Sequence, residues 1–256
     1  MLVAYFDESG THGASAPVTT VSGLVGSALE WSRLERPWKK ALGDFPCFHA
    51  TDYEFGSGDF AGVYDQGPND LSQRLAEQIA ERRLIGVSAS VYRDDWEYGA
   101  SKELKADHPS HYHFCLALAL LFVSQVSKEF GDNQPVAVVF ANQQEYKSYS
   151  VLIHEAFNKS VRWGNIGSLS FGEPRCVTQL QAADLFAYEI YQELKFQLKN
   201  VNEVPWRKPA RSQLQTICRS LHIEGRIAGV PFLHACSNSM DDLASVVDAA
   251  KTASPS

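Results

Sequence analysis

The chain has 256 residues, of which 45% are hydrophobic, including 14 Phe, 10 Tyr and 5 Trp. A chain of this size and composition can bury a large core without a disulfide or metal staple, which excludes disorder for most of its length. The formal net charge of −7 excludes a protein that holds nucleic acid by overall positive charge. Any contact with nucleic acid therefore needs a local basic patch or bound cations.

Short strand patterns and helical patterns alternate in the first half of the chain. Residues 2–6 and 18–25 are rich in strand formers and end near glycines, and the eleven residues between them suit a hairpin with a long loop. Next, the pattern predicts a helix over 31–42, which Pro37 either kinks or begins, and then a short strand around Phe48 with a loop to 59. A helix capped by Asn69, with its apolar face over 71–84, and an alternating strand over 84–92 are predicted to follow.

Two long helical patterns dominate the second half. Residues 110–130 are apolar almost all round and end at Gly131, and residues 178–199 carry a buried stripe. The continuous apolar run 135–141 is typical of a central strand covered on both faces. The remaining predictions are a charged surface segment over 94–109, a helix over 150–158, a strand over 167–171, a loop over 200–211 and a short helix over 214–221.

This order of elements predicts an α/β fold, a mixed sheet flanked by helices on both faces. Because the sequence contains no internal repeat, linker or shift in composition, we expect one domain over residues 1–240. Residues 241–256, which are rich in Ala and Ser, are predicted to form a mobile tail.

The cysteines and the apolar runs indicate the compartment. Five scattered cysteines without a C-x-x-C pair predict neither a disulfide framework nor a cysteine zinc site. A reducing cytoplasm is therefore the expected location. The longest apolar run, 114–123, has ten residues, half of the ~20 that a membrane span needs, so we expect no membrane partner.

Two acids follow the first predicted strand. Asp7 and Glu8 point to opposite faces of the sheet if the strand continues through them, because side chains alternate along a strand. A carboxylate at this place is a hard oxygen ligand suited to magnesium or manganese. The alternative is a strand end whose loop is simply solvated.

A third acid lies on the apolar stripe of the predicted helix 178–199. Asp184 has Leu180, Ala183 and Ala187 at helical spacing, so its carboxylate needs a partner in the protein interior. A core hydrogen bond or salt bridge is one answer, and a metal shared with Asp7 is the other. Gln181, one turn earlier, is placed to share the same polar niche.

Three short motifs resemble those of the domain of unknown function 3800 family. The segment 5–10 (Tyr-Phe-Asp-Glu-Ser-Gly) resembles its opening motif, 180–188 (Leu-Gln-Ala-Ala-Asp-Leu-Phe-Ala-Tyr) resembles its C-terminal signature, and 48–50 (Phe-His-Ala) resembles an element between them. The resemblance implies a ribonuclease H-like fold, in which a first-strand Asp and a last-helix acid meet at one metal site. It also implies a bacterial or phage setting and a role in defence or mobile elements.

Ribonuclease H-like chemistry requires several carboxylates that bind metal, and this sequence supplies only some of them. Two divalent metals about 4 Å apart activate water and stabilise the leaving oxygen. Asp7, Glu8 and Asp184 are the predicted ligands, but the acid expected after the central strand, near 141 or 142, is absent. Asn142 through its carbonyl and Glu145 from the following turn are the predicted substitutes.

The first hypothesis is a magnesium- or manganese-dependent nuclease or related phosphoryl-transfer hydrolase. A less favoured hypothesis of the same kind is a metal-dependent hydrolase of a small phosphorylated substrate. The alternative is a ribonuclease H-like binding or scaffold protein that has lost the chemistry, which the missing acid favours. Nucleic acid is the expected partner, held through a metal-bridged phosphate. The predicted catalytic residues are Asp7, Glu8, Asp184, Glu145 and His49.

Several polar side chains are candidates for contact with substrate. His49 is predicted to orient substrate or water, Ser9 to contact a phosphate or to cap its turn, and Arg175 and Gln181 to bind substrate. The basic stretch 206–211 either meets a phosphate backbone or is a solvated loop. A group of Asp107, His108, His111 and His113 either binds a metal or consists of loop and helix-cap residues.

Overall fold

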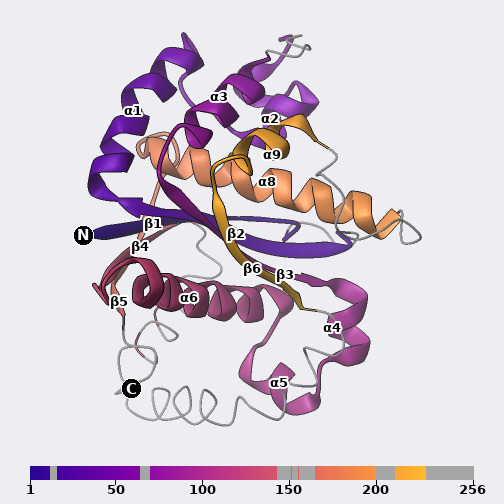
Figure 1. Ribbon diagram of the computed structural model, residues 1–256. Coiled ribbons are helices and arrows are strands. Elements are labelled where there is room, and N and C mark those ends of the chain that lie inside the picture. Colours follow the sequence, from indigo (N-terminus) through magenta and orange to yellow (C-terminus); the bar gives the residue numbers. More distant parts are fainter. Residues whose placement is uncertain are drawn as a thin grey trace, which may run out of the picture.

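The computed structural model describes residues 1–11, 16–63, 70–142, 151, 155, 165–199 and 211–228, with the backbone alone for 222–228. The described chain forms a six-stranded mixed sheet in the order β5-β4-β1-β2-β3-β6, with helices on both faces (Figure 1). The predicted α/β class is therefore confirmed. The predicted tail, most of the helix predicted over 150–158 and the loop over 200–210 lie outside the described residues.

The sheet combines an antiparallel half with parallel pairs. Strands β1 (Leu2–Ser9), β2 (Val18–Ser27) and β3 (Leu84–Tyr92) form an antiparallel meander. Strand β4 (Val136–Ala141) pairs parallel with β1, β5 (Ile166–Gly172) pairs parallel with β4, and β6 (His222–Ala228) pairs parallel with β3. Because β1, β4 and β5 run in the same direction, their carboxyl ends meet at one edge of the sheet.

One face of the sheet, here called the α8 face, is covered by helices from both halves of the chain (Figure 1). Helix α8 packs directly on β1 and β2, and its Phe186 shares a core cluster with Leu24 and Trp38. The elements on this side are α1 (Ala28–Leu42), α2 (Ala50–Phe55), the 3₁₀ turn η1 (Gly58–Phe60), α3 (Leu71–Ala80), α8 (Thr178–Lys199) and α9 (Ser212–Ile217).

The opposite face, here called the α6 face, is covered by α6 (His111–Phe130), with α4 (Arg93–Gly99) and α5 (Lys102–Asp107) beside it (Figure 1). Among the described helices, α6 is long and apolar enough to cross a membrane by length and composition. However, 67% of its apolar window is buried inside the structure, where it packs on Phe6 and Phe140 of the sheet. This burial is typical of the core helix of a soluble protein.

Several predicted elements need correction. Asp70, not Asn69, caps α3, because its carboxylate accepts the Gln73 N–H at 2.7 Å. The segment around Phe48 contains no strand and leads into α2, and the charged segment 94–109 forms α4 and α5. Pro37 lies inside α1 rather than at its start. The predicted short helix ends at Ile217, and β6 was not predicted.

Candidate functional site

The candidate site lies at the carboxyl end of β1. The strand pairs with β2 as far as Ser9↔Thr20, so Asp7 and Glu8 belong to the strand itself and not to a loop after it. Val3 and Tyr5 pack in the core of the α8 face, and alternation therefore directs Asp7 to the same face. Asp7 is 9% exposed and Asp184, on α8, is 5% exposed. The fold thus brings the two predicted carboxylates to one buried region.

The electrostatics of this region connect three carboxyl groups. Burial, and then the charge of the neighbouring Asp184, raise the pKa of Asp7 well above its ordinary value. The Glu8 N–H, which donates to Asp7 Oδ1 at 2.9 Å, lowers this pKa but does not offset the increase. Burial also raises the pKa of Asp184 to about 7. For Glu8, burial, Asp7 and Asp184 all raise the pKa. The region carries more negative charge than its surroundings stabilise, so a proton or a cation is required there.

Asp184 and Gln181 hold the Phe48–Ala50 segment against α8. The Ala50 N–H donates to Asp184 Oδ2 at 2.7 Å. Gln181 Oε1 accepts the Phe48 N–H at 3.1 Å and the Trp38 indole N–H at 3.0 Å, while its Nε2 donates to the Pro174 carbonyl at 2.8 Å. Two of the three motifs are therefore joined by hydrogen bonds. Gln181 is buried, and both its amide oxygen and its amide nitrogen form hydrogen bonds with protein groups. It therefore holds the Phe48–Ala50 segment in place rather than contacting substrate.

His49 stands at the rim of the site. It is the residue before α2, its side chain is 54% exposed, and its Nδ1 lies 3.0 Å from Asp52 Oδ2. Burial of Asp52 is outweighed by the Ser57 hydroxyl and His49, which lower the pKa of this carboxyl group. A carboxylate at Asp52 therefore orients the imidazole, and the exposed part of the ring is available to a bound molecule.

Asn142 follows β4, where the sequence lacks an acid. Its Nδ2 donates to Glu173 Oε1, and its Oδ1 is buried without a hydrogen-bond partner among the described residues. Glu8 Oε1 is also buried without a hydrogen-bond partner among the described residues. Glu173, directly after β5, was missed by sequence reasoning. Its place as an acid just after a predicted strand was a signal too general to single it out without knowing its neighbour Asn142.

The remaining predicted contacts have different outcomes. Ser9 is within β1 and opposite Thr20, so it does not cap a turn. Arg175 is exposed and donates from Nη2 to Asp59 Oδ2 at 2.7 Å. Glu145 lies outside the described residues. Of the basic stretch 206–211 only Arg211 is described. It is partly exposed and forms two hydrogen bonds each with Glu189 and Glu54.

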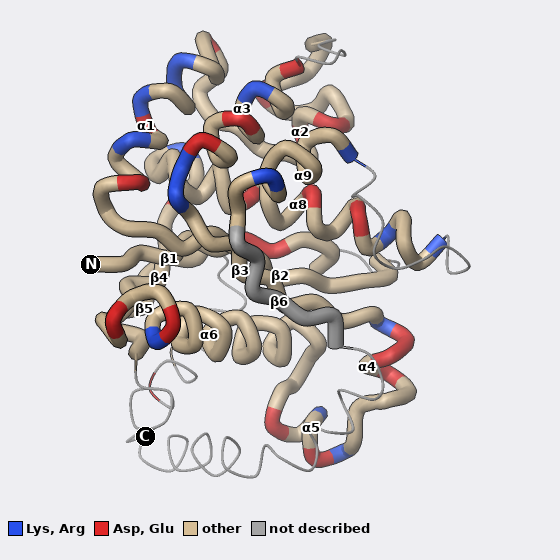
Figure 2. Tube along the Cα trace, viewed as in Figure 1, with Lys and Arg blue, Asp and Glu red and all other residues tan. Residues whose placement is uncertain are grey.

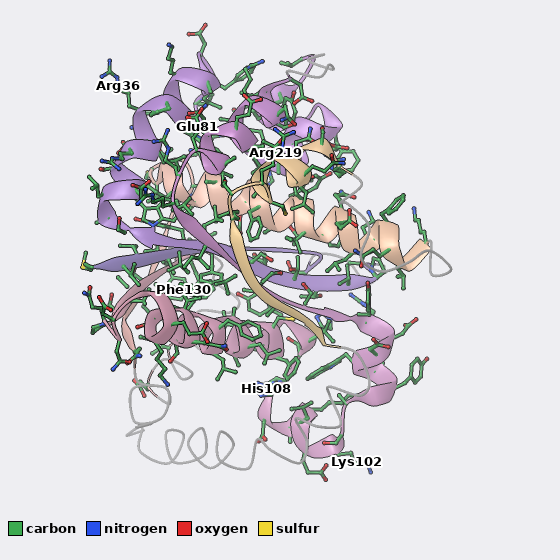
Figure 3. The ribbon with its side chains drawn as sticks, in the orientation of Figure 1. Arg36, Glu81, Lys102, His108, Phe130 and Arg219 are labelled. Atoms are coloured by element: carbon green, nitrogen blue, oxygen red, sulfur yellow. The ribbon has the colours of Figure 1, made fainter. Side chains whose placement is uncertain are left out.

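The histidine group near the start of α6 lies away from these carboxylates. His108 is 1% exposed, and Figure 3 places it next to α6 on the side away from α8. His111 Nδ1 lies 2.9 Å from the Thr19 hydroxyl, and His113 Nδ1 lies 2.7 Å from that of Ser110. These contacts, with burial that lowers the pKa of both His111 and His113, assign the histidines to helix capping and packing.

The donor set at the carboxyl end of β1 suits a hard cation. The candidate ligands are oxygens, namely the carboxylates of Asp7, Glu8 and Asp184 and the amide oxygen of Asn142, and magnesium and manganese prefer such ligands. In the part of the chain that the structure describes, no three His, Cys, Asp or Glu side chains are already arranged to hold a metal ion. The residues fit such a metal by chemistry and burial, and their side chains would have to converge to hold it.

Comparison with known proteins gives no relative: no family model, no curated protein and no solved structure matches the chain.

Proposed function

We propose that the protein is a divalent-metal-dependent nuclease or related phosphoryl-transfer hydrolase with a ribonuclease H-like fold, as the resemblance to the domain of unknown function 3800 family implies. The observation that carries this proposal is the burial of Asp7 of β1 and Asp184 of α8 in one region, where the charge of Asp184 helps to raise the pKa of Asp7. Two carboxylates in such a region are costly without a cation or protons. A purely structural role gives no reason to keep both.

The residues of the site would divide the work as follows. Asp7 and Asp184 would hold magnesium or manganese, with Glu8 and Asn142 as further ligands. The bound metal would supply activation of water and stabilisation of the leaving oxygen. Asp184 has Oδ1 for this purpose, because Oδ2 accepts the Ala50 N–H. His49, oriented by Asp52, would orient substrate or exchange a proton at its exposed nitrogen.

The charge distribution supports a metal-bridged contact with a phosphate rather than a broad basic surface. In the described part of the chain, Lys and Arg are interleaved with Asp and Glu on the same helices (Figure 2). The formal net charge is −7. We therefore propose that nucleic acid in the cytoplasm is the partner and that it binds poorly when the metal is chelated.

The test is cleavage of single- and double-stranded DNA and RNA by the purified protein with manganese, compared with Asp7→Asn. Loss of an outer partner of a metal ligand already costs about 10- to 100-fold, so loss of a ligand should reduce the cleavage rate by at least about 100-fold. Glu35→Gln is the matched control, since Glu35 is an exposed acid of α1 that pairs with Lys39. Equal cleavage by the Asp7→Asn variant would rule the proposal out.

A second candidate is a binding or scaffold protein of the same fold, and Asn142 in place of an acid favours it. A neutral amide holds a divalent cation less tightly than a carboxylate. This candidate expects binding of nucleic acid or protein without metal-dependent turnover. A panel that adds small phosphorylated substrates separates both candidates from a hydrolase of small molecules.

A further inference from the structure

Two strand ends next to the buried carboxylates carry a pair of residues that the proposed function does not explain. β4 and β5 are parallel and in register up to Ala141↔Gly172, so Asn142 and Glu173 leave the sheet side by side. The Asn142 N–H donates to the Gly172 carbonyl at 2.9 Å, which keeps the two strand ends together. Their side chains are then joined by the hydrogen bond from Asn142 Nδ2 to Glu173 Oε1.

This hydrogen bond determines the orientation of the amide. A carboxylate only accepts hydrogen bonds, so the NH₂ group of Asn142 has to face Glu173. The carbonyl oxygen then points the other way, where Oδ1 is buried and has no partner among the described residues. A buried acceptor without a donor is unfavourable unless a proton or a cation meets it.

A second unpartnered oxygen lies on the neighbouring strand. Phe6 and Phe140 are paired in the β1–β4 register and stack with ring centroids 5.3 Å apart. Glu8 and Asn142 each follow this pair by two residues, so alternation gives them the same face of the sheet. Glu8 Oε1 is also buried without a partner among the described residues. Two buried oxygens on adjacent strands therefore have no hydrogen-bond donor in the part of the chain that the structure describes.

We infer that Glu173 is the positioning residue of the metal site: it orients Asn142 so that the amide oxygen, together with Glu8, binds the divalent cation. Glu8 and Asn142 belong to the α6 face and Asp7 to the α8 face, so a shared cation has to lie at the carboxyl end of the strands, where both faces can reach it. The charges of Asp7 and Asp184 both raise the pKa of Glu8, as expected for three carboxyl groups near one another at this edge. This inference rests on the proposed function, since the cation is the one that Asp7 and Asp184 would hold. The backbone of Glu173 is fixed independently, because its carbonyl accepts the N–H groups of Cys176 and Val177 at the turn into α8. The pair thus supplies one neutral ligand where an acid was expected.

The inference also explains why an acid is absent at position 142. An Asp there would face the carboxylate of Glu173, and like charges at this distance repel. The amide and the carboxylate can be exchanged between positions 142 and 173. In an Asn142→Asp/Glu173→Gln double variant, the amide of residue 173 donates to the carboxylate of residue 142, so the hydrogen bond is kept and the acid is restored.

The experiment is calorimetric titration of manganese into the metal-free full chain. Glu173→Gln should weaken binding by about 10-fold, as expected for loss of an outer partner, and the double variant should bind at least as tightly as the wild type. Since Glu173 is exposed, its variant should keep the thermal midpoint of the wild type, which separates positioning from a structural role. Glu97→Gln, an exposed acid of α4 beside Lys105, is the control and should change nothing.

The outcomes separate this inference from the proposed function. Wild-type affinity in Glu173→Gln, together with loss of binding in Asp7→Asn and Asp184→Asn, would overturn the role of Glu173 and leave the proposed function standing. Unchanged binding in Asp7→Asn and Asp184→Asn would contradict the proposed function itself. A wild-type protein that binds no manganese would overturn both.

Discussion

The two faces of the sheet are built from different interactions. On the α6 face, a helix that is apolar almost all round packs on Val, Ala and Phe side chains of the strands. On the α8 face, the end of the sheet near Asp7 is polar although it is buried. There, Thr20, Ser22, Ser88 and Ser90 form a chain of hydroxyl contacts of 2.7–2.8 Å across β2 and β3. Ser22 is opposite Asp7 in the β1–β2 register.

The difference shows where the fold accepts a cost in stability. Apolar burial is non-directional and proportional to area, so the α6 face tolerates many sequences of similar volume. Buried polar groups stabilise only when every partner is present. The α8 face satisfies its strand hydroxyl groups in this way, but the carboxyl end of β1 leaves Asp7 and Asp184 on this face, and Glu8 on the other, with excess charge. This concentration of unmet charge is the physical reason to place function there.

The largest effect on stability is expected on the α6 face. Phe114 is fully buried and packs against Trp96 with ring centroids 5.3 Å apart. Phe114→Ala should lower the free energy of unfolding by about 3–5 kcal/mol, because it leaves a cavity in a closely packed core. Urea denaturation measures this, with Tyr98→Ala, at an 88% exposed position, as the control. The folded variant should bind manganese as the wild type does; a loss of metal affinity would mean that the two faces are not independent.

A change on the α8 face should affect stability and function together. Gln181→Leu removes the partners of the Phe48 N–H, the Trp38 indole and the Pro174 carbonyl. Each buried group without a partner costs about 1–3 kcal/mol, so we expect a loss of about 2–4 kcal/mol after partial relaxation.

Cleavage should also decrease in the Gln181→Leu variant, because His49 and Ala50 are no longer held against α8. Gln197→Leu near the end of the same helix is the matched control, since Gln197 bonds only to Glu193 among the described contacts. Activity equal to that of the control, measured well below the unfolding temperature, would show that the segment 48–50 is not part of the site.

The parts of the fold that sequence predicts well have a local cause. The bounds of β3 (Leu84–Tyr92) and α8 (Thr178–Lys199) agree with prediction, since alternation and the apolar stripe are properties of the segment itself. The segment around Phe48 was misread because its conformation depends on Gln181 and Asp184, more than 130 residues away. β6 was missed because it pairs parallel with a strand far away in the chain.

The candidate site divides in the same way. Asp184 is recognisable from sequence because a carboxylate on an apolar stripe demands a partner. Glu173 is not, because its significance depends on the register between β4 and β5, which places it next to Asn142. The orientation of the Asn142 amide follows only once that neighbour is known. Sequence patterns therefore identify buried acids more readily than the residues that position them.

The smallest expected effect is a difference in pH dependence between the two faces. Burial, and then the nearby His111, lower the pKa of His113 on the α6 face to about 4, whereas an unfolded His titrates near ~6.5. Between these values the unfolded chain binds a proton that the folded protein does not, so this group makes the protein less stable as the pH falls from about 6.5 to about 4. The raised pKa of Asp184, about 7, has the opposite sign: the folded protein binds the proton first and gains stability on acidification.

Removing either group from the metal-free protein should therefore change the pH profile in opposite directions. Relative to the wild type, His113→Gln should make the free energy of unfolding rise more, or fall less, as the pH is lowered from 6.5 to 4, because the destabilising proton uptake is gone. Asp184→Asn should do the reverse, since the stabilising uptake is gone. Urea denaturation at several pH values with a chelator present measures both, with Asp44→Asn at an exposed position as control. If both variants change the profile in the same direction, protonation of the buried groups does not affect stability in opposite ways on the two faces.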